Sequence, residues 1–382
     1  MNYTFSDLEK YLDTILVREK VPGFVCKVMH NGKEVFRHQG GYADLENNIK
    51  MTGDEHFFIY SASKVITCAA AMHAFEEGKF LMSHPVWWYL GEFADCKVRV
   101  KREDGSVDLV PQEGEIVIQD LFNMCAGLDY NFDSPTLKEA LLKYPNAPTR
   151  EIIRGIVKNG LDYQPATKWQ YSFCHDVLAC LVEVATGERF KDYVKRVIFD
   201  PLGMNDSYYH PTPELLDKMC AQYRFNHSLG IPERVEKTNP YIFGPDYDSG
   251  GAGVITTIHD YAKFASALAN YGVGQNGARI LSKASVNLMR TNTLDERRLK
   301  YFKEWRNNFE YGYGFGVRTK MDVGRGGSLA PNGEFGWDGA AGFFVSIDPT
   351  KNVAIVYAQH LLNPHHEVIH PKIRNLVHMI IE

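Results

Sequence analysis

The sequence of this 382-residue chain contains no run of about 18 apolar residues, the length that a transmembrane helix needs. Its first fifteen residues, MNYTFSDLEKYLDTI, lack the basic start and the apolar core of a secretory signal peptide. A basic excess is missing too, since the net charge is −5, so we expect no surface that attracts nucleic acid or anionic lipid. These absences predict a cytoplasmic protein with neither nucleic-acid nor membrane partners.

The chain also lacks the cysteine patterns of disulfide frameworks and zinc sites. Its seven cysteines are odd in number, and no two of them form a Cys-x-x-Cys pair. We therefore expect reduced thiols, no metal and no other cofactor. Hydrophobic residues make up 45% and charged residues 23% of the chain, which is typical of a soluble globular protein with room for two or three domains.

Residues 57–78, FFIYSASKVITCAAAMHAFEEG, combine a polar start with an apolar continuation. Ser61 and Lys64 are three residues apart, so a helix that begins at Ser61 would place both side chains on one face. A serine hydroxyl is a weak nucleophile until a base takes its proton, and a nearby lysine amine is such a base. The apolar run predicts a buried helix that ends at Gly78. One Ser-x-x-Lys pair also arises by chance in a chain of this length, so further motifs must support a nucleophile.

The two ends of the chain favour strands, and the middle favours helices. Asn31-Gly32 stands between two strand-like runs and predicts a β-hairpin that follows an N-terminal helix. Residues 205–248 show almost no periodicity. The remaining strands are expected at 311–319, 342–348 and 353–359, with a closing helix at 369–381. This order predicts one sheet that is divided in sequence by a helical insertion.

Two further motifs offer groups for a site between the sheet and the helices. Tyr171 stands just before an expected helix at 175–186, where a phenolate beside a lysine would act as a general base. Taken alone it is more often a core tyrosine. The glycine-rich segment 336–342, GWDGAAG, precedes a strand and would let a ligand approach the strand edge, although taken alone such a segment is more often a turn with a bulge.

Together these motifs resemble the penicillin-recognising serine hydrolases, which include class C β-lactamases, DD-peptidases and family VIII carboxylesterases. The resemblance covers nearly the whole chain. It is carried by EEGKF, PATKWQYS, LVEVATGERFKDYVKRVIFDPLGM, GGAGVITTIHDYAKF and GEFGWDGAAGFFVSIDP, in addition to the Ser-x-x-Lys motif. It implies that Ser61 is the nucleophile, Lys64 its proton acceptor, and Tyr171 a second base that protonates the leaving group. The backbone N–H groups of Ser61 and Ala340 would form the oxyanion hole.

The third motif is closer to the esterase branch of this family. Trp337-Asp338-Gly339 stands where lactamases carry Lys-Thr-Gly and where esterase-like members usually carry Trp-Gly-Gly. Phe173 replaces the asparagine of Tyr-x-Asn. We expect Phe173, Trp337, Asp338 and Gly339 to contact substrate, and the acidic Asp338 to favour neutral or cationic substrates. The alternative is that strand alternation points Asp338 away from the site while Trp337 and Gly339 face it.

The resemblance implies an α/β (α+β) fold of the β-lactamase/transpeptidase type, with an antiparallel sheet flanked by terminal helices. We expect a sheet domain at 1–78 and 235–382, a mainly helical domain at 79–234, and an active site in the cleft between them. The expected activity is that of an esterase-like serine hydrolase acting on small esters or amides. Alternatives are a β-lactamase or DD-peptidase, a D-amino-acid peptidase or amidase, an acyltransferase using the same serine, and a non-catalytic scaffold. A missing Gly-x-Ser-x-Gly motif argues against an α/β-hydrolase.

Overall fold

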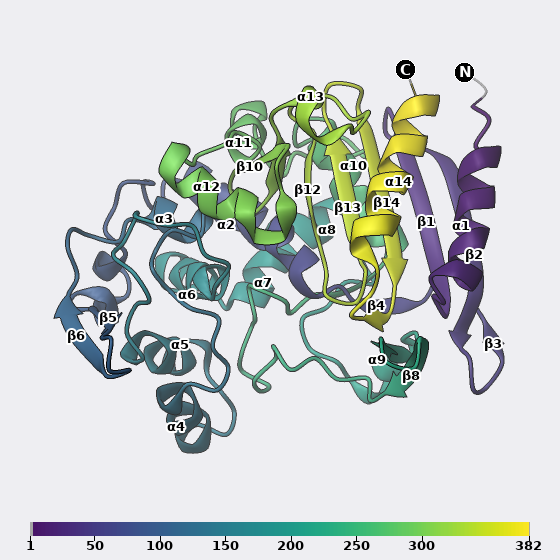
Figure 1. The fold of residues 1–382 in the computed structure, drawn as a ribbon. Helices are drawn as coiled ribbons and strands as arrows, with labels where there is room; N and C mark the ends of the chain where they lie inside the picture. The colour runs from purple at the N-terminus through teal and green to yellow at the C-terminus, as the bar shows by residue number, and fades with distance from the viewer. Residues whose placement is uncertain (1–2, 382) are drawn as a thin grey trace.

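A computed structural model describes residues 3–381 of the chain. One eight-stranded antiparallel sheet forms its frame, in the order β10-β11-β12-β13-β14-β1-β2-β3 (Figure 1). Strands from the two ends of the chain therefore meet at the centre of the sheet, as the sequence predicts. The strands are β1 (Gly23–His30), β2 (Lys33–Asp44), β3 (Ile49–Lys50), β10 (Tyr311–Tyr313), β11 (Arg318–Lys320), β12 (Phe335–Asp338), β13 (Phe344–Asp348) and β14 (Val353–Gln359).

Helices cover both faces of this sheet. The terminal helices α1 (Ser6–Arg18) and α14 (His366–Ile380) lie side by side on one face, where Leu12 and Ile373 join a core with Phe344 (Figure 1). Helix α10 (Ile258–Ala269) packs on the opposite face against β1, β13 and β14. The expected flanking terminal helices are confirmed.

Most of the remaining helices form a second lobe beside the sheet (Figure 1). They are η2 (Val86–Trp88), η3 (Gly91–Phe93), α3 (Ile118–Phe122), α4 (Pro135–Lys143), α5 (Thr149–Lys158), α6 (Cys174–Thr186), α7 (Phe190–Val194), η4 (Lys195–Phe199) and α8 (Asp200–Leu202). An exposed hairpin of β5 (Lys97–Lys101) and β6 (Val107–Pro111) belongs to this part of the chain. The boundaries of the two domains stay a prediction.

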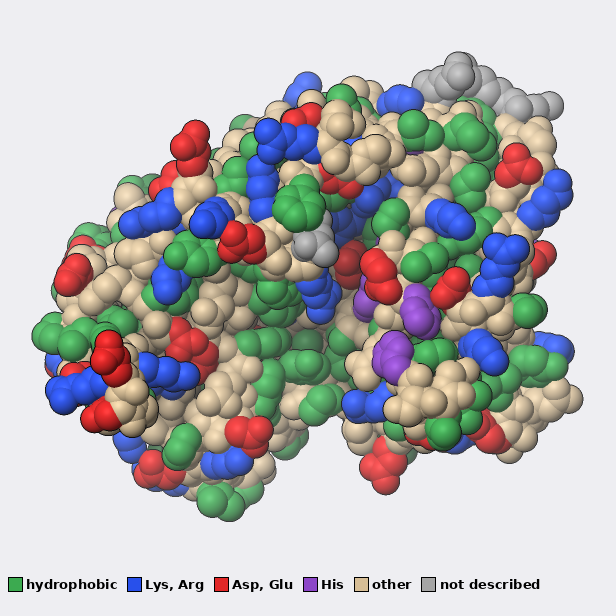
Figure 2. Space-filling model, in the orientation of Figure 1, with side chains coloured by type: hydrophobic (Ala, Val, Ile, Leu, Met, Phe, Trp, Pro, Cys, Tyr) green, Lys and Arg blue, Asp and Glu red, His purple; other side chains and the backbone are tan. Residues whose placement is uncertain are grey.

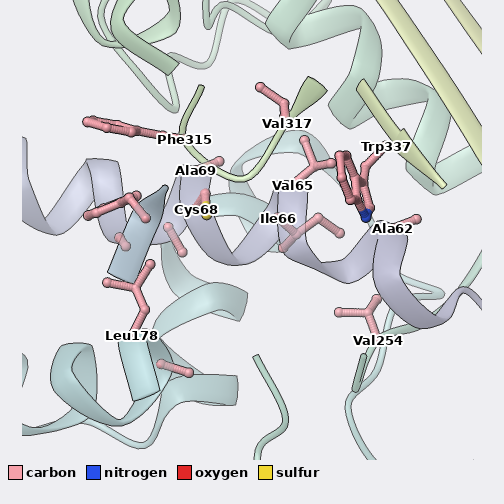
Figure 3. Packing of buried hydrophobic residues seen from close by; sticks show 14 of the residues in the cluster. Ala62, Val65, Ile66, Cys68, Ala69, Leu178, Val254, Phe315, Val317 and Trp337 are labelled. Carbon is pink, nitrogen blue, oxygen red and sulfur yellow. The ribbon is translucent and has the colours of Figure 1, made fainter. Parts of the chain in front are cut away.

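Helix α2 (Ser63–Glu76) connects the two parts, because it packs against α6 and α7 as well as α11 (Lys283–Met289) and β12. Val65, Ile66 and Cys68 are surrounded on all sides by apolar side chains from distant parts of the chain (Figure 3). The α2 core includes Trp337 of β12 and Leu178 of α6 (Figure 3). The expected all-round burial of this helix is confirmed, and so is the left-handed Gly78 just after it.

The hairpin turn follows its sequence closely. Asn31 and Gly32 have φ of 50° and 76°, the left-handed values of a type I′ turn between β1 and β2. The single strand expected at 311–319 is wrong: Gly314 and Gly316 help to turn the chain, so β10 and β11 pair with each other as a hairpin. Two short strands, β7 (Gln222–Asn226) and β8 (Ile231–Val235), lie in the segment without periodicity.

Several short helices and strands connect the larger elements. They are β4 (His56–Phe58), η1 (Tyr60–Ala62), α9 (Pro213–Lys218), β9 (Ile255–Thr257), α12 (Glu296–Glu304), η5 (Trp305–Asn307), α13 (Val323–Gly326) and β15 (Leu361–Leu362). All seven cysteines are buried and unpaired. Within residues 3–381, no helix is both long and apolar enough to cross a membrane.

Candidate active site

Ser61 lies on the short turn η1, which leads from β4 into α2. The residue before it, Tyr60, has a φ of 47°, an unusual left-handed value for a bulky side chain. Its buried hydroxyl donates hydrogen bonds to Gln222 Oε1 at 2.8 Å and to the carbonyl oxygen of Thr238 at 3.2 Å, which help to hold this backbone. Strained residues of this kind cost about 1–3 kcal/mol and cluster at functional sites. The turn leaves the Ser61 side chain at a half-buried position.

The structure brings Ser61, Lys64 and Tyr171 together. Ser61 Oγ accepts hydrogen bonds from Lys64 Nζ at 3.3 Å and from the Tyr171 hydroxyl at 2.6 Å. Tyr171 comes from the segment that enters α6, 110 residues further along the chain. Both potential proton acceptors are therefore within hydrogen-bonding reach of one hydroxyl, which is the geometry that a serine nucleophile requires.

Lys64 is completely buried, and its amine has a fixed direction. Besides Ser61, the amine donates to the carbonyl oxygen of Gly251 at 2.7 Å, and it lies 4.6 Å from the centre of the Tyr171 ring. A buried ammonium is stable only when hydrogen bonds and charges compensate for lost water. Gly251 lies in the Gly-Gly-Ala-Gly segment 250–253, which the sequence resemblance includes but to which it gives no role.

Two tyrosines flank the Lys64 amine and differ in their surroundings. The Tyr130 ring centre lies 5.4 Å from the amine, and burial, followed by the nearby Tyr171, raises the pKa of Tyr130 well above its usual value. Tyr130 therefore stays protonated at neutral pH. Tyr171 donates directly to Ser61 Oγ, so of the two tyrosines it is the one within reach for proton transfer.

The end of β12 lies against the turn that carries Ser61. A Cβ atom on Gly339 would clash with the carbonyl oxygen of Ile59, so only glycine permits this approach. The Gly339 N–H donates to Phe343 at 2.7 Å and thereby closes the turn that contains Ala340. Trp337, two residues earlier, stacks on Tyr171 with ring centres 5.9 Å apart and planes 14° apart.

Aromatic side chains surround the hydroxyl groups of Ser61 and Tyr171. The Phe173 ring lies 4.7 Å from Tyr130 and 4.9 Å from Phe132, and Trp305 stacks on Tyr171 at 5.1 Å. The predicted contact residues Phe173 and Trp337 both belong to this group. It consists of Tyr130, Phe132, Tyr171, Phe173, Tyr241, Phe243, Trp305 and Trp337. We refer to these eight side chains as the aromatic enclosure.

Asp338 points to the other face of β12. Its carboxylate pairs with the Arg318 guanidinium at 2.8 Å and lies 3.8 Å from His370 Nδ1 on α14. Burial alone would raise the pKa of Asp338, but Arg318 and then His370 lower it to about 2. The carboxylate is thus ionised and compensated within the protein, and it is separated from the Trp337 side chain by strand alternation.

A cavity of about 580 Å³ borders this second face of β12. Its walls carry several charged side chains, among them Arg306, Arg318, Arg374, Glu310 and Asp338. In Figure 2 the hollow between the two lobes has hydrophobic side chains in its lower part, with charged and histidine side chains along its upper and right-hand rim. Apolar and charged surfaces therefore meet at the end of β12.

The sequence did not point to several residues of this site. Tyr130 is in the segment LDYNF, Tyr241 is in a region without periodicity, and Trp305 follows a helix that was not expected. Their common signal is an aromatic residue beside a turn, which is too frequent in a chain with 21 tyrosines and 22 phenylalanines to single them out. Among residues 3–381, no three His, Cys, Asp or Glu side chains are grouped in a way that would hold a metal ion.

A helix-borne Ser-Lys pair with a tyrosine, placed between an antiparallel sheet and a helical lobe, defines the β-lactamase/transpeptidase-like fold. The chain belongs to the β-lactamase family, since the family model described as Beta-lactamase matches residues 8–377. This assignment covers both lobes.

Similar proteins include both hydrolases and proteins without an assigned activity. Protein Rv1367c of Mycobacterium tuberculosis is 28% identical over 345 residues, which cover 88% of this chain and 84% of that protein. Esterase EstB of Burkholderia gladioli is 27% identical over 290 residues, which cover 68% of this chain and 69% of the esterase. Among solved structures, EstCE1, titled a hydrolase with promiscuous acyltransferase activity, aligns over 99% of this chain and 98% of its own with a TM-score of 0.77 at 21% identity.

Proposed function

We propose that this protein is an esterase-like serine hydrolase that cleaves small esters, and amides more slowly, through an acyl-enzyme on Ser61. The observation that carries the proposal is that Lys64 and Tyr171 both form hydrogen bonds to one serine hydroxyl, at 3.3 Å and 2.6 Å. Membership of the β-lactamase family and the similarity to esterase EstB support it.

The proposed reaction begins with proton transfer from Ser61 to the Lys64 amine as Ser61 Oγ attacks the carbonyl carbon of the substrate. The tetrahedral oxyanion would accept hydrogen bonds from the backbone N–H groups of Ser61 and Ala340. Ser61 is in η1, the turn directly before α2, and backbone N–H groups at a helix start have no partner within the helix. Gly339 brings Ala340 close to this turn. The Tyr171 phenol then donates its proton to the leaving alkoxide.

Water completes the cycle by attacking the acyl-enzyme. The same groups act in reverse: Tyr171 takes a proton from the water, and Lys64 returns a proton to Ser61 Oγ. Each positioned proton transfer of this type contributes about 10²- to 10⁴-fold to the rate. The net reaction consumes one ester and one water and releases an acid and an alcohol.

The aromatic enclosure favours an apolar acyl or alcohol group. Phe173 offers a ring where an amide side chain would bind a substrate amide, and Trp337 replaces the lysine that would meet a substrate carboxylate. The preference for cationic substrates rested on Asp338, and its ion pair with Arg318 weakens that argument. We therefore propose neutral esters as the favoured class, with cationic esters accepted and β-lactams poor.

Acyl transfer to an alcohol or amine is the second candidate function. The aromatic enclosure would hold an apolar acceptor beside the acyl-enzyme, in the position where water otherwise attacks. Such an acceptor competes with water through its local concentration, which a pocket can raise above that in solution. The fold similarity to EstCE1, whose title names both activities, motivates a test of this option.

The experiment is hydrolysis of a short-chain aryl ester by wild type and Ser61→Ala, each with and without an added apolar alcohol. We expect turnover by wild type only, with the folded Ser61→Ala protein at background. An ester product that appears with the alcohol would establish transfer. Equal turnover by both proteins would overturn the proposal, and rapid hydrolysis of a cephalosporin would favour a β-lactamase. Inactivity of wild type toward esters, amides and β-lactams alike would favour a scaffold.

A further inference from the structure

Asp176 is a buried acid that the proposed reaction does not use. It lies in the first turn of α6, five residues after Tyr171, and only 3% of it is exposed. Its Oδ1 accepts hydrogen bonds from the Tyr247 hydroxyl at 3.0 Å, the Ser249 hydroxyl at 2.9 Å and the Gly251 N–H at 3.2 Å. Three donors on one oxygen fix the carboxylate against the 247–251 segment.

Gly251 joins this carboxylate to the Lys64 amine. Its N–H donates to Asp176, while its carbonyl oxygen accepts from Lys64 Nζ at 2.7 Å. A Cβ atom at this position would lie 2.5 Å from Asp176 Oδ2, so the close approach requires glycine. Movement of the carboxylate would therefore move the carbonyl group that directs the lysine amine toward Ser61.

The other groups around the amine do not supply a negative charge. Burial lowers the pKa of His175 to about 3 and raises that of Cys68 well above its usual value, so both are neutral near pH 7. The rings of Tyr130 and Tyr171 face the amine from the helical lobe. Burial raises the pKa of Asp176 above its usual value, and Lys64 and the three donors offset part of this rise. Of these neighbours, Asp176 is the one that carries a carboxylate.

We propose that Asp176 is a positioning residue for Lys64: its carboxylate orients the Gly251 carbonyl and supplies the counter-charge of the buried amine. This role rests on the proposed function, because it concerns the proton acceptor of Ser61. The role also accounts for the position of Asp176 at the start of α6, close in sequence to Tyr171. The first turn of α6 holds Asp176, and the residues just before it deliver the Tyr171 phenol.

The test is the pH dependence of Ser61 inactivation by a neutral fluorophosphonate, followed by intact mass. Asp176→Asn keeps an oxygen acceptor but removes the charge. Without the counter-charge a positive charge at this buried position is less favourable, so inactivation of Ser61 should persist to lower pH. We expect the acidic limb of the inactivation profile to move down by about one pH unit, a tenfold change in the proton equilibrium.

Asp120→Asn is the matched control. Asp120 is also buried, at 4% exposure, and accepts from the Val117 N–H at 3.0 Å, but its charged neighbour is Arg298. The control profile should stay within about 0.3 pH unit of wild type, well below the tenfold step. Tyr247→Phe removes one hydrogen-bond donor to Asp176, which makes the Asp176 carboxylate easier to protonate. The acidic limb of the Tyr247→Phe profile should therefore move down in pH, as in Asp176→Asn, but by a smaller amount.

The outcomes separate the two proposals. A shifted limb in Asp176→Asn with an unchanged control supports the positioning role. An unshifted limb in folded Asp176→Asn, or equal shifts in Asp120→Asn, overturns it while the nucleophile stands. If Asp176→Asn does not fold, an unshifted Tyr247→Phe profile overturns the role. Wild type that shows no adduct on Ser61 overturns the proposed function, and the positioning role with it.

Discussion

The two faces of β12 differ in chemistry although their side chains are adjacent in sequence. Trp337 lies on the face of α2, where it stacks on Tyr171 and Trp305. Asp338 lies on the face of α14, where it pairs with Arg318. Strand alternation places the first residue in the site and the second in a structural ion pair. A residue inside a catalytic motif can therefore serve the fold, and the motif alone does not show which residues act on substrate.

The largest effect should follow a change on the reacting face. Tyr171→Phe removes the hydroxyl that lies 2.6 Å from Ser61 Oγ, and we expect kcat to fall by about 10²- to 10⁴-fold with a much smaller change in KM. Tyr130→Phe is the matched variant, because Tyr130 also borders Lys64 but stays protonated. It should lower kcat by less than about tenfold, which is below the range that a positioned proton transfer contributes. Similar losses in both variants would mean that Tyr171 is not the base.

Gly339→Ala tests the contact between β12 and the serine turn. The added methyl group would clash with the carbonyl oxygen of Ile59, so β12 or the turn has to move. We expect kcat/KM to fall at least tenfold and the free energy of unfolding to fall by about 1–3 kcal/mol, as for other overpacked sites. Gly91→Ala is the control, since a Cβ atom there meets no neighbour within 4 Å. Full activity of Gly339→Ala would contradict the proposed oxyanion geometry.

A change on the α14 face of β12 should alter the free energy of unfolding. The pKa of Asp338 is lowered from 3.8 to about 2, so its stabilising contribution is complete above pH 3.8 and disappears as the pH falls through 2. Because the side chain is 30% exposed, we expect Asp338→Asn to lower the free energy of unfolding at pH 7 by about 1–2 kcal/mol.

Urea unfolding of both proteins between pH 2 and pH 7 measures this difference. The two stability curves should converge at the acidic end. Asp7→Asn removes an exposed acid that lies 3.7 Å from Lys10 and should cost at most about 0.5 kcal/mol. A constant difference between wild type and Asp338→Asn down to pH 2 would show that the ion pair is not its cause.

The smallest effect concerns substrate charge. If the Asp338 charge is compensated by Arg318, Asp338→Asn should change the ratio of kcat/KM for cationic and neutral esters of one size by less than about threefold. A matched set of neutral, anionic and cationic aryl esters measures the ratio. A change of tenfold or more would show that Asp338 selects substrate charge after all.

Local sequence signals predicted the elements that position Ser61, the proposed nucleophile. The spacing of Ser61 and Lys64, the apolar run after them and Asn31-Gly32 each depend on neighbouring residues, so they were visible without a structure. The β10–β11 hairpin was not, because Gly314 and Gly316 interrupt a segment that reads as one strand. Its division follows from pairing with β12, which is distant in sequence.

The residues of the candidate site also divide into those with a local sequence signal and those placed by contacts between distant segments. Ser61, Lys64 and Tyr171 belong to motifs, whereas Trp305 contributes by stacking on Tyr171, which is distant in sequence. The orientation of Asp338 depended on the register of β12 and on Arg318 from another strand, neither of which composition or spacing contains. Contacts between distant segments decide such roles.

The central claim is that Ser61 is the one acylated residue of the site. Incubation with a fluorophosphonate, followed by intact mass and peptide mapping, tests it directly. The account predicts a single adduct on the peptide that contains Ser61, none in Ser61→Ala, and slow labelling in Lys64→Met, which lacks the amine within 3.3 Å of the hydroxyl. An adduct on any other residue, or equal labelling of Ser61→Ala, would contradict it.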